Sequence, residues 1–80
     1  MAQKMVYLTP EGLAKYEAEL AHLVKVRRPQ VVERIQRAKE MGGTVNNAEY
    51  DEAKNEQSFL EGRVLTVEAM LKNAVVIKEG

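Results

Sequence analysis

Six basic side chains are the residues of this sequence whose type and spacing suggest a binding chemistry. Lysine and arginine contact phosphate oxygens, so a group of them on one face favours a nucleic-acid backbone as the ligand. The alternative is that they are solvated charges that form ion pairs with nearby acids. The basic residues are Arg27, Arg28, Arg34, Arg37, Lys39 and Lys54, and the acids are Glu33, Glu40, Asp51 and Glu52. The residues alone leave both interpretations open.

Catalytic chemistry has little support in this sequence. The absence of cysteine excludes a thiol nucleophile, a disulfide and a Cys-based zinc site. His22 is the single histidine, and Ser58 has no histidine near it in a simple hairpin of two helices. The pair Gly42-Gly43 lacks the preceding strand and the lysine that a phosphate-binding loop requires. We therefore expect a protein that is not an enzyme and that binds no cofactor of its own.

The length and the charge balance set further limits. Eighty residues form at most one small domain, so residues 1–80 are treated as one unit. Twelve basic and twelve acidic residues cancel, which excludes nucleic-acid binding by bulk charge and leaves room only for a local basic stripe. No apolar run is long enough to span a membrane, and the N-terminus has no signal-type stretch. We therefore expect a cytoplasmic protein without a membrane partner.

The basic residues must be positioned by helices, and the first helix is predicted from about residue 10 to 41. Thr9 and Pro10 form a typical helix start, since threonine caps and proline suits the first position. Apolar residues then recur every three or four positions, as in helices that pack on helices: Leu13, Tyr16, Leu20, Leu23, Val31, Ile35 and Ala38. One step of three becomes four near Pro29, which removes a backbone hydrogen bond. We predict a kink or a break within a turn of Pro29.

A second long helix follows a short connection at residues 42–47. Gly42 and Gly43 end the first helix, and Asn46 with Glu49 resembles a capping box. The apolar repeat then continues almost without interruption through Tyr50, Ala53, Gln57, Leu60, Val64, Val67, Leu71 and Ala74. Two helices joined by so short a connection run antiparallel. We predict an all-α fold, a long antiparallel two-helix coiled-coil hairpin with arms of about 40 Å.

The two ends of the chain and three apolar residues complete the prediction. Residues 5–8 and 74–77 are rich in β-branched or aromatic side chains, and they either pair at the base of the hairpin or remain frayed. Phe59, Leu65 and Met70 lie off the apolar repeat, and packing on the first helix is favoured over a partner-binding patch. A structural arm, an oligomerisation module and a free-standing RNA-binding hairpin all remain compatible with these features.

Five short motifs resemble the Gre family of bacterial transcript-cleavage factors, in the part that forms their N-terminal coiled-coil domain. They occur in the family's order and spacing and cover nearly the whole chain. The motifs are Leu8-Thr9-Pro10-Glu11-Gly12, Val26-Arg27-Arg28-Pro29, Asn47-Ala48-Glu49-Tyr50, Glu61-Gly62-Arg63 and Lys72-Asn73-Ala74-Val75-Val76-Ile77.

The resemblance implies a transcription elongation factor whose partner is bacterial RNA polymerase. We expect the chain to be a monomer. Gre factors insert the hairpin into the secondary channel of the polymerase, where the tip stimulates the polymerase's own cleavage of backtracked RNA with the Mg²⁺ of the polymerase active site. A basic patch is assigned to the 3′ end of the nascent RNA. The polymerase-binding or RNA-binding residues that the resemblance implies are Arg37, Lys39, Lys54, Asn47, Glu49 and Tyr50.

Two departures from the family pattern concern the tip and the length. Where the family's tip carries an Asp and a Glu, this chain has Gly43 and Asn46, which offer no carboxylate to magnesium. We therefore expect impaired stimulation of cleavage, from a natural paralogue or from an altered tip, and we expect Glu49 to serve the start of the second helix. The family also carries a C-terminal FKBP-like domain, so the sequence is expected to be an excised domain or a short natural form.

Overall fold

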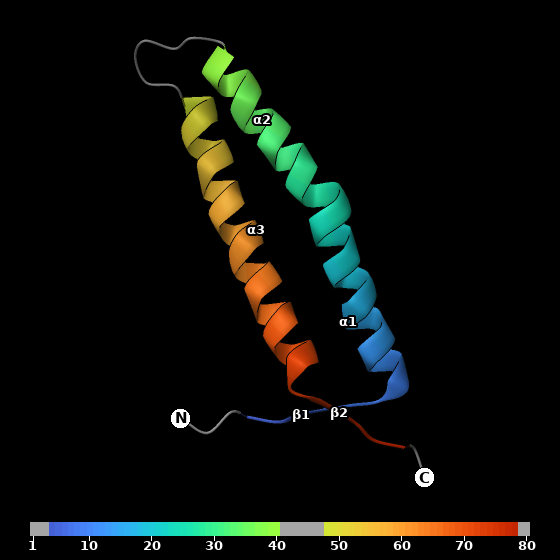
Figure 1. Cartoon of the computed structure of the whole chain (residues 1–80). Coiled ribbons are helices and arrows are strands. Elements are labelled where there is room, and N and C mark those ends of the chain that lie inside the picture. The colour runs from blue at the N-terminus through green and yellow to red at the C-terminus, as the bar shows by residue number, and fades with distance from the viewer. Residues whose placement is uncertain (1–3, 41–47, 79–80) are drawn as a thin grey trace.

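The chain folds into a narrow helical hairpin whose first and last strands meet at its base (Figure 1). The computed structural model describes residues 4–40 and 48–78. In chain order the elements are β1 (Val6–Leu8), α1 (Pro10–His22), the π-helix η1 (Leu23–Arg27), α2 (Arg28–Glu40), α3 (Ala48–Lys72) and β2 (Ala74–Val76). The radius of gyration is 17.2 Å, whereas a compact chain of this length has about 12 Å. The predicted two-helix hairpin with short extended segments at its base is confirmed.

The start of α1 follows the predicted cap. The backbone N–H of Gly12 donates to Oγ1 of Thr9 at 3.0 Å, and the N–H of Leu13 donates to the Thr9 carbonyl at 2.9 Å. Pro10 occupies the first helical position, where its missing N–H costs nothing. The cap fixes the point at which the chain turns from the base into the long arm.

The predicted break near Pro29 is a π-helix. The N–H of Arg28 donates to the carbonyl of Leu23, which lies five residues earlier instead of the usual four. A turn of this kind holds one residue more than an α-helical turn, so it absorbs the extra residue in the apolar repeat. Pro29 lacks the N–H that would reach the carbonyl of Lys25 in an ordinary helix. The break is therefore confirmed, and η1 lies directly before the proline-containing turn of α2.

The core lies between the two arms and follows the predicted repeat. Its buried residues are Val31, Ile35, Ala38, Ala53, Leu60, Val64 and Val67. Leu20, Leu23 and Val24 pack against this cluster from the α1 and η1 side. The repeat predicted for α3 is thus confirmed, although Leu71 is only half-buried and Ala74 belongs to β2 instead of the helix.

A two-stranded parallel sheet closes the base of the hairpin. β1 pairs with β2 in the register Val6 to Ala74, Tyr7 to Val75 and Leu8 to Val76. The N–H of Val6 donates to the carbonyl of Asn73 at 2.9 Å, and the N–H of Ile77 donates to that of Leu8 at 2.8 Å. β1 runs across the base toward the start of α1, and β2 runs across it away from the end of α3. Both strands therefore cross the base in the same direction and are parallel (Figure 1). Of the two alternatives for the end segments, pairing at the base and fraying, the structure shows pairing.

The expectation for the apolar residues outside the repeat is wrong at two positions. The side chains of Phe59 and Leu65 are 81% and 67% exposed, so neither packs on the first arm. Both lie on the sides of α3 that face away from the other arm, because a two-helix hairpin covers only one stripe of each helix. Met70 is half-buried. No helix in residues 4–40 and 48–78 is long and apolar enough to cross a membrane.

Candidate functional site

A groove between α2 and α3, near the tip, brings two of the predicted basic residues together. Lys39 reaches it from the last turn of α2, and Lys54 reaches it from the second turn of α3. The groove has a volume of about 230 Å³, and its other lining residues are Val32, Ile35, Gln36, Tyr50 and Gln57. Lys54 Nζ donates to Oε1 of Gln57 at 3.3 Å. We call this surface the lysine groove.

The two lysines of the groove differ from the predicted arginines in their contacts with carboxylates. Within the described ranges, neither Lys39 nor Lys54 forms an ion pair. Tyr50 joins them as a half-buried aromatic side chain that also packs against the core cluster. Two ammonium groups beside an aromatic ring and neutral amides form a surface suited to a phosphate backbone with an adjoining base.

Arg37 does not belong to the lysine groove. Its Nη2 donates to Oε1 of Glu33 at 2.6 Å, one turn earlier on the same helix, and both side chains are largely exposed. It lines a second groove of about 300 Å³ together with Gln30, Glu33 and Arg34. The predicted basic patch is therefore divided between two sides of α2.

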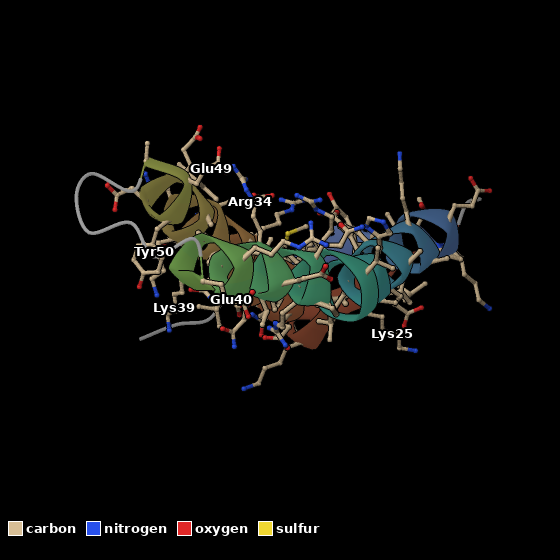
Figure 2. All side chains as sticks on the ribbon, turned by 90° about the horizontal axis from the view of Figure 1, so that it is seen from above. Lys25, Arg34, Lys39, Glu40, Glu49 and Tyr50 are labelled. Carbon is tan, nitrogen blue, oxygen red and sulfur yellow. The ribbon has the colours of Figure 1, made fainter. Side chains whose placement is uncertain are left out.

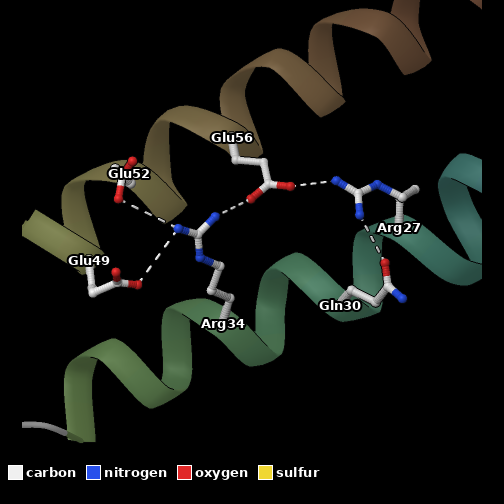
Figure 3. A network of polar contacts seen from close by, with 6 residues as sticks. All are labelled: Arg27, Gln30, Arg34, Glu49, Glu52 and Glu56. Carbon is white, nitrogen blue, oxygen red and sulfur yellow. Dashed lines mark hydrogen bonds and ion pairs between the residues drawn. The ribbon is translucent and has the colours of Figure 1, made fainter.

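The opposite side of the hairpin carries a network of ion pairs (Figure 3). Arg34 of α2 reaches Glu56 at 2.6 Å, and its other nitrogen lies 3.6 Å from Glu49 and 3.7 Å from Glu52. Glu56 also accepts from Arg27 at 2.5 Å, and Arg27 donates to Oε1 of Gln30 at 3.0 Å. These arginines are thus engaged with carboxylates and are not offered to a phosphate group.

Two further pairs connect the arms toward the base. Arg28 donates twice to Glu61, both times at 2.8 Å, and Arg63 donates to Glu19 at 2.5 and 2.8 Å. The hydrogen bond from Arg63 lowers the pKa of the Glu19 carboxyl, because it stabilises the ionised form. The hydrogen bonds that Arg28 donates to Glu61 and Arg34 donates to Glu56 raise the pKa values of the two arginines. These arginines therefore form ion pairs, as the solvated-charge interpretation expects, whereas the described ranges hold no ion pair of Lys39 or Lys54.

The sequence missed the main acidic partners in this set. It named Glu33 and Glu52 correctly, but the shared acceptor is Glu56, and Glu61 and Glu19 hold the remaining pairs. The sequence did hold some information on these partners, because residues at similar distances along the chain from the connection face each other in an antiparallel hairpin. The extra residue in η1 shifts that register for the base half, so the partners could not be assigned from counting alone.

The predicted tip residues are only partly within the described structure. Gly43, Asn46 and Asn47 lie outside the described residues, and so does the proposed capping box. Glu49 lies in the first turn of α3, with its side chain 57% exposed and directed toward Arg34. Tyr50 and Lys39 lie on the opposite side from Glu49 and Arg34 (Figure 2). His22 is exposed at the end of α1.

Among residues 4–40 and 48–78, no three His, Asp or Glu side chains gather in a set that could hold a metal ion. The acids Glu49, Glu52 and Glu56 surround Arg34, whose guanidinium takes the place that a cation would need. At the tip positions Gly43 and Asn46 the sequence supplies no carboxylate.

Comparison with known proteins agrees with the arrangement of elements. The family model described as transcription elongation factor, N-terminal, matches residues 6–76, from the start of β1 to the end of β2. Transcription elongation factor GreA of Thermoanaerobacter pseudethanolicus is 58% identical over 76 residues, which are 95% of this chain and 48% of that protein. GreA of Bacillus subtilis is 50% identical over 80 residues, which are 99% of this chain and 51% of that protein.

The chain spans about half the length of the curated relatives it matches. The match includes both arms, η1 and both strands, so it rests on the whole described hairpin and not on one motif. The chain therefore belongs to the GreA and GreB family of transcription elongation factors, in which it corresponds to the N-terminal domain.

Proposed function

We propose that this chain is the arm with which a transcription elongation factor acts on bacterial RNA polymerase. The observation that carries the proposal is the family match over residues 6–76, combined with a molecule that measures 60 × 28 × 13 Å. An arm of this width and length enters a narrow channel, and its tip reaches a site far from the base. In this proposal the hairpin occupies the secondary channel of the polymerase, and the tip points toward the active site.

The lysine groove is the proposed contact for the nascent RNA. Lys39 and Lys54 would neutralise phosphates of the displaced 3′ segment, and Tyr50 would support an adjoining base. The groove lies in the tip half of the hairpin, where RNA extruded from an active site would meet it first. Arg37 contributes little in this proposal, because Glu33 already holds it.

Stimulation of RNA cleavage is the part of the family activity that we propose to be impaired. The resemblance implies an Asp and a Glu at the tip, and this sequence has Gly43 and Asn46 at those positions. Glycine has no side-chain oxygen that could bind a metal ion, and the neutral amide oxygen of asparagine attracts Mg²⁺ less strongly than a carboxylate does. Glu49 remains, but Arg34 and the start of α3 engage it.

The test joins residues 1–80 of this chain to the C-terminal half of GreA from Bacillus subtilis and measures cleavage in backtracked elongation complexes. We expect binding to core polymerase and competition with intact GreA, without acceleration of cleavage. Gly43→Asp together with Asn46→Glu should recover magnesium-dependent cleavage, and neither change alone should do so fully.

Two other outcomes would contradict the proposal. Strong cleavage by the unchanged chimera would show that carboxylates at these two positions are dispensable, and Glu49 would be the next residue to test. Failure of the chimera to bind core polymerase, while naked RNA shifts in a salt-dependent way, would favour a free-standing RNA-binding hairpin. Failure to bind either would favour a structural arm.

A further inference from the structure

The π-helix η1 is the part of the first arm that its own backbone supports least. Its hydrogen bond from Arg28 spans five residues, and Pro29 has no N–H for the carbonyl of Lys25. None of the five residues of η1 is buried, and Val26 is 41% exposed. Leu23 and Val24 of η1 are half-buried and pack against the core cluster, so partial packing, without regular backbone bonding, supports the direction of the arm at this point.

Ion pairs to α3 hold this point from two sides. Arg27, the last residue of η1, pairs with Glu56 at 2.5 Å. Arg28, the first residue of α2, makes two hydrogen bonds of 2.8 Å to Glu61. Glu56 and Glu61 lie five residues apart on α3, which is a rotation of about 140° around an α-helix, so the two pairs attach to different sides of α3. A change in the bend of η1 must lengthen at least one of them.

Glu56 extends this support toward the tip. The same carboxylate that accepts from Arg27 also accepts from Arg34, two turns farther along the arm (Figure 3). Its side chain is 28% exposed, less than those of Glu49, Glu52 and Glu61. Removal of this one charge leaves two guanidinium groups without their short contact, so Glu56 controls both the bend and the stretch of α2 beyond it.

We propose that η1 is a hinge whose bend is locked by the pairs Arg27 to Glu56 and Arg28 to Glu61. When the pairs are released, the tip half of the hairpin changes direction relative to the base half. The pairs are partly exposed, so dissolved salt screens them and the lock weakens as ionic strength rises. This property belongs to the chain by itself, and its test does not depend on the proposed role in transcription.

The first test uses amide hydrogen exchange measured by NMR in Glu56→Gln, Glu61→Gln and the double variant. Exchange at residues 24–28 should become faster by roughly two- to fivefold in Glu61→Gln, the range that loss of one exposed ion pair produces, and by at least as much in Glu56→Gln, which removes the partner of both Arg27 and Arg34. The control Glu33→Gln removes the pair with Arg37 within α2 and leaves the contacts to α3 intact, so it should not change these amides. Raising the salt concentration from about 0.02 to 1 M should have the same local effect on the unchanged chain.

The second test measures the bend directly. The chain has no cysteine, so the exposed positions Lys15 and Glu40 can be replaced by Cys and spin-labelled without other changes. The distance distribution between the labels should broaden in the Glu56→Gln, Glu61→Gln background and stay narrow with Glu33→Gln. Unchanged exchange and an unchanged distribution would overturn the proposal. A uniform rise in exchange over all three α-helices would also overturn it, because the pairs would then support the whole hairpin and not the hinge.

Discussion

Arg37 and Lys39 point to different sides of α2, although they are only two positions apart. Arg37 donates to Glu33 along its own helix, whereas Lys39 lines the groove that Lys54 enters from α3. Residues two apart on a helix do not share a face. The two predicted basic residues for which the described structure holds no ion pair, Lys39 and Lys54, therefore share the lysine groove.

This division predicts unequal effects of charge reversal on RNA contact. Lys39→Glu with Lys54→Glu should weaken crosslinking to the 3′ end of backtracked RNA in a polymerase complex by at least about tenfold, since two charge-assisted contacts are lost. The fold should survive, because surface changes shift stability by about half a kcal/mol or less. Arg37→Glu is the matched control and should have a much smaller effect. Equal losses from Arg37 and the two lysines would contradict the assignment of the groove.

The burial of α3 predicts that alanine substitutions at two of its aliphatic residues have different effects on stability. Val67 is completely buried, so Val67→Ala should lower the free energy of unfolding by about 1–3 kcal/mol. Leu65→Ala removes a larger side chain from an exposed position and should be close to neutral. Urea denaturation followed by circular dichroism measures both. Neutral results for Val67→Ala and Leu71→Ala together would refute the packing of the two arms along this repeat.

Gly62 offers a route to a more stable hairpin. It lies in the middle of α3, and a Cβ added there meets nothing within 4 Å. Gly62→Ala should therefore raise the free energy of unfolding by about 0.5–1 kcal/mol, the usual difference between glycine and alanine inside a helix. Gly12→Ala is the comparison, since its Cβ would lie 3.3 Å from the Oγ1 of Thr9 that caps α1. The prediction fails if the thermal midpoint of Gly62→Ala is unchanged or lower.

The pair of Glu19 and Arg63 predicts a dependence of stability on pH. The hydrogen bond from Arg63 lowers the pKa of the Glu19 carboxyl below the ordinary value of about 4.3. A pKa that is lowered in the folded state stabilises the fold at pH values above the ordinary pKa. This stabilisation is lost as the pH falls through the lowered pKa. Glu19→Gln should therefore unfold at a lower urea concentration than the unchanged chain at pH 7.

The same comparison at acidic pH supplies the control. Once Glu19 is protonated, it resembles the glutamine that replaces it, so the two urea midpoints should converge as the pH falls well below about 4.3. Concentrated salt at pH 7 should reduce the difference as well, because the pair is partly exposed. A difference that persists unchanged at low pH would assign the effect of Glu19→Gln to something other than this ion pair.

Much of the hairpin could be read from local patterns. The cap at Thr9, the repeat from Tyr50 to Leu71 and the disturbed spacing near Pro29 each depend on neighbouring residues, and each is confirmed. The apolar repeat marks which stripe of a helix is covered, so the buried residues of α3 followed from spacing. The expectation was wrong for Phe59 and Leu65, whose large apolar side chains suggested burial. A helix that packs against one other helix buries only one side, so apolar residues on its other sides stay exposed.

The sequence by itself determined two long helices, their antiparallel course and the stripe of each that is buried, since these depend on period, caps and the length of a connection. Only the tertiary structure decided which charged side chains meet. Ion pairs between the arms depend on the rotation and register of one helix against the other, and the extra residue in η1 changes both for the base half. Glu56 therefore became the shared partner of Arg27 and Arg34, and Lys39 and Lys54 were left facing the same groove.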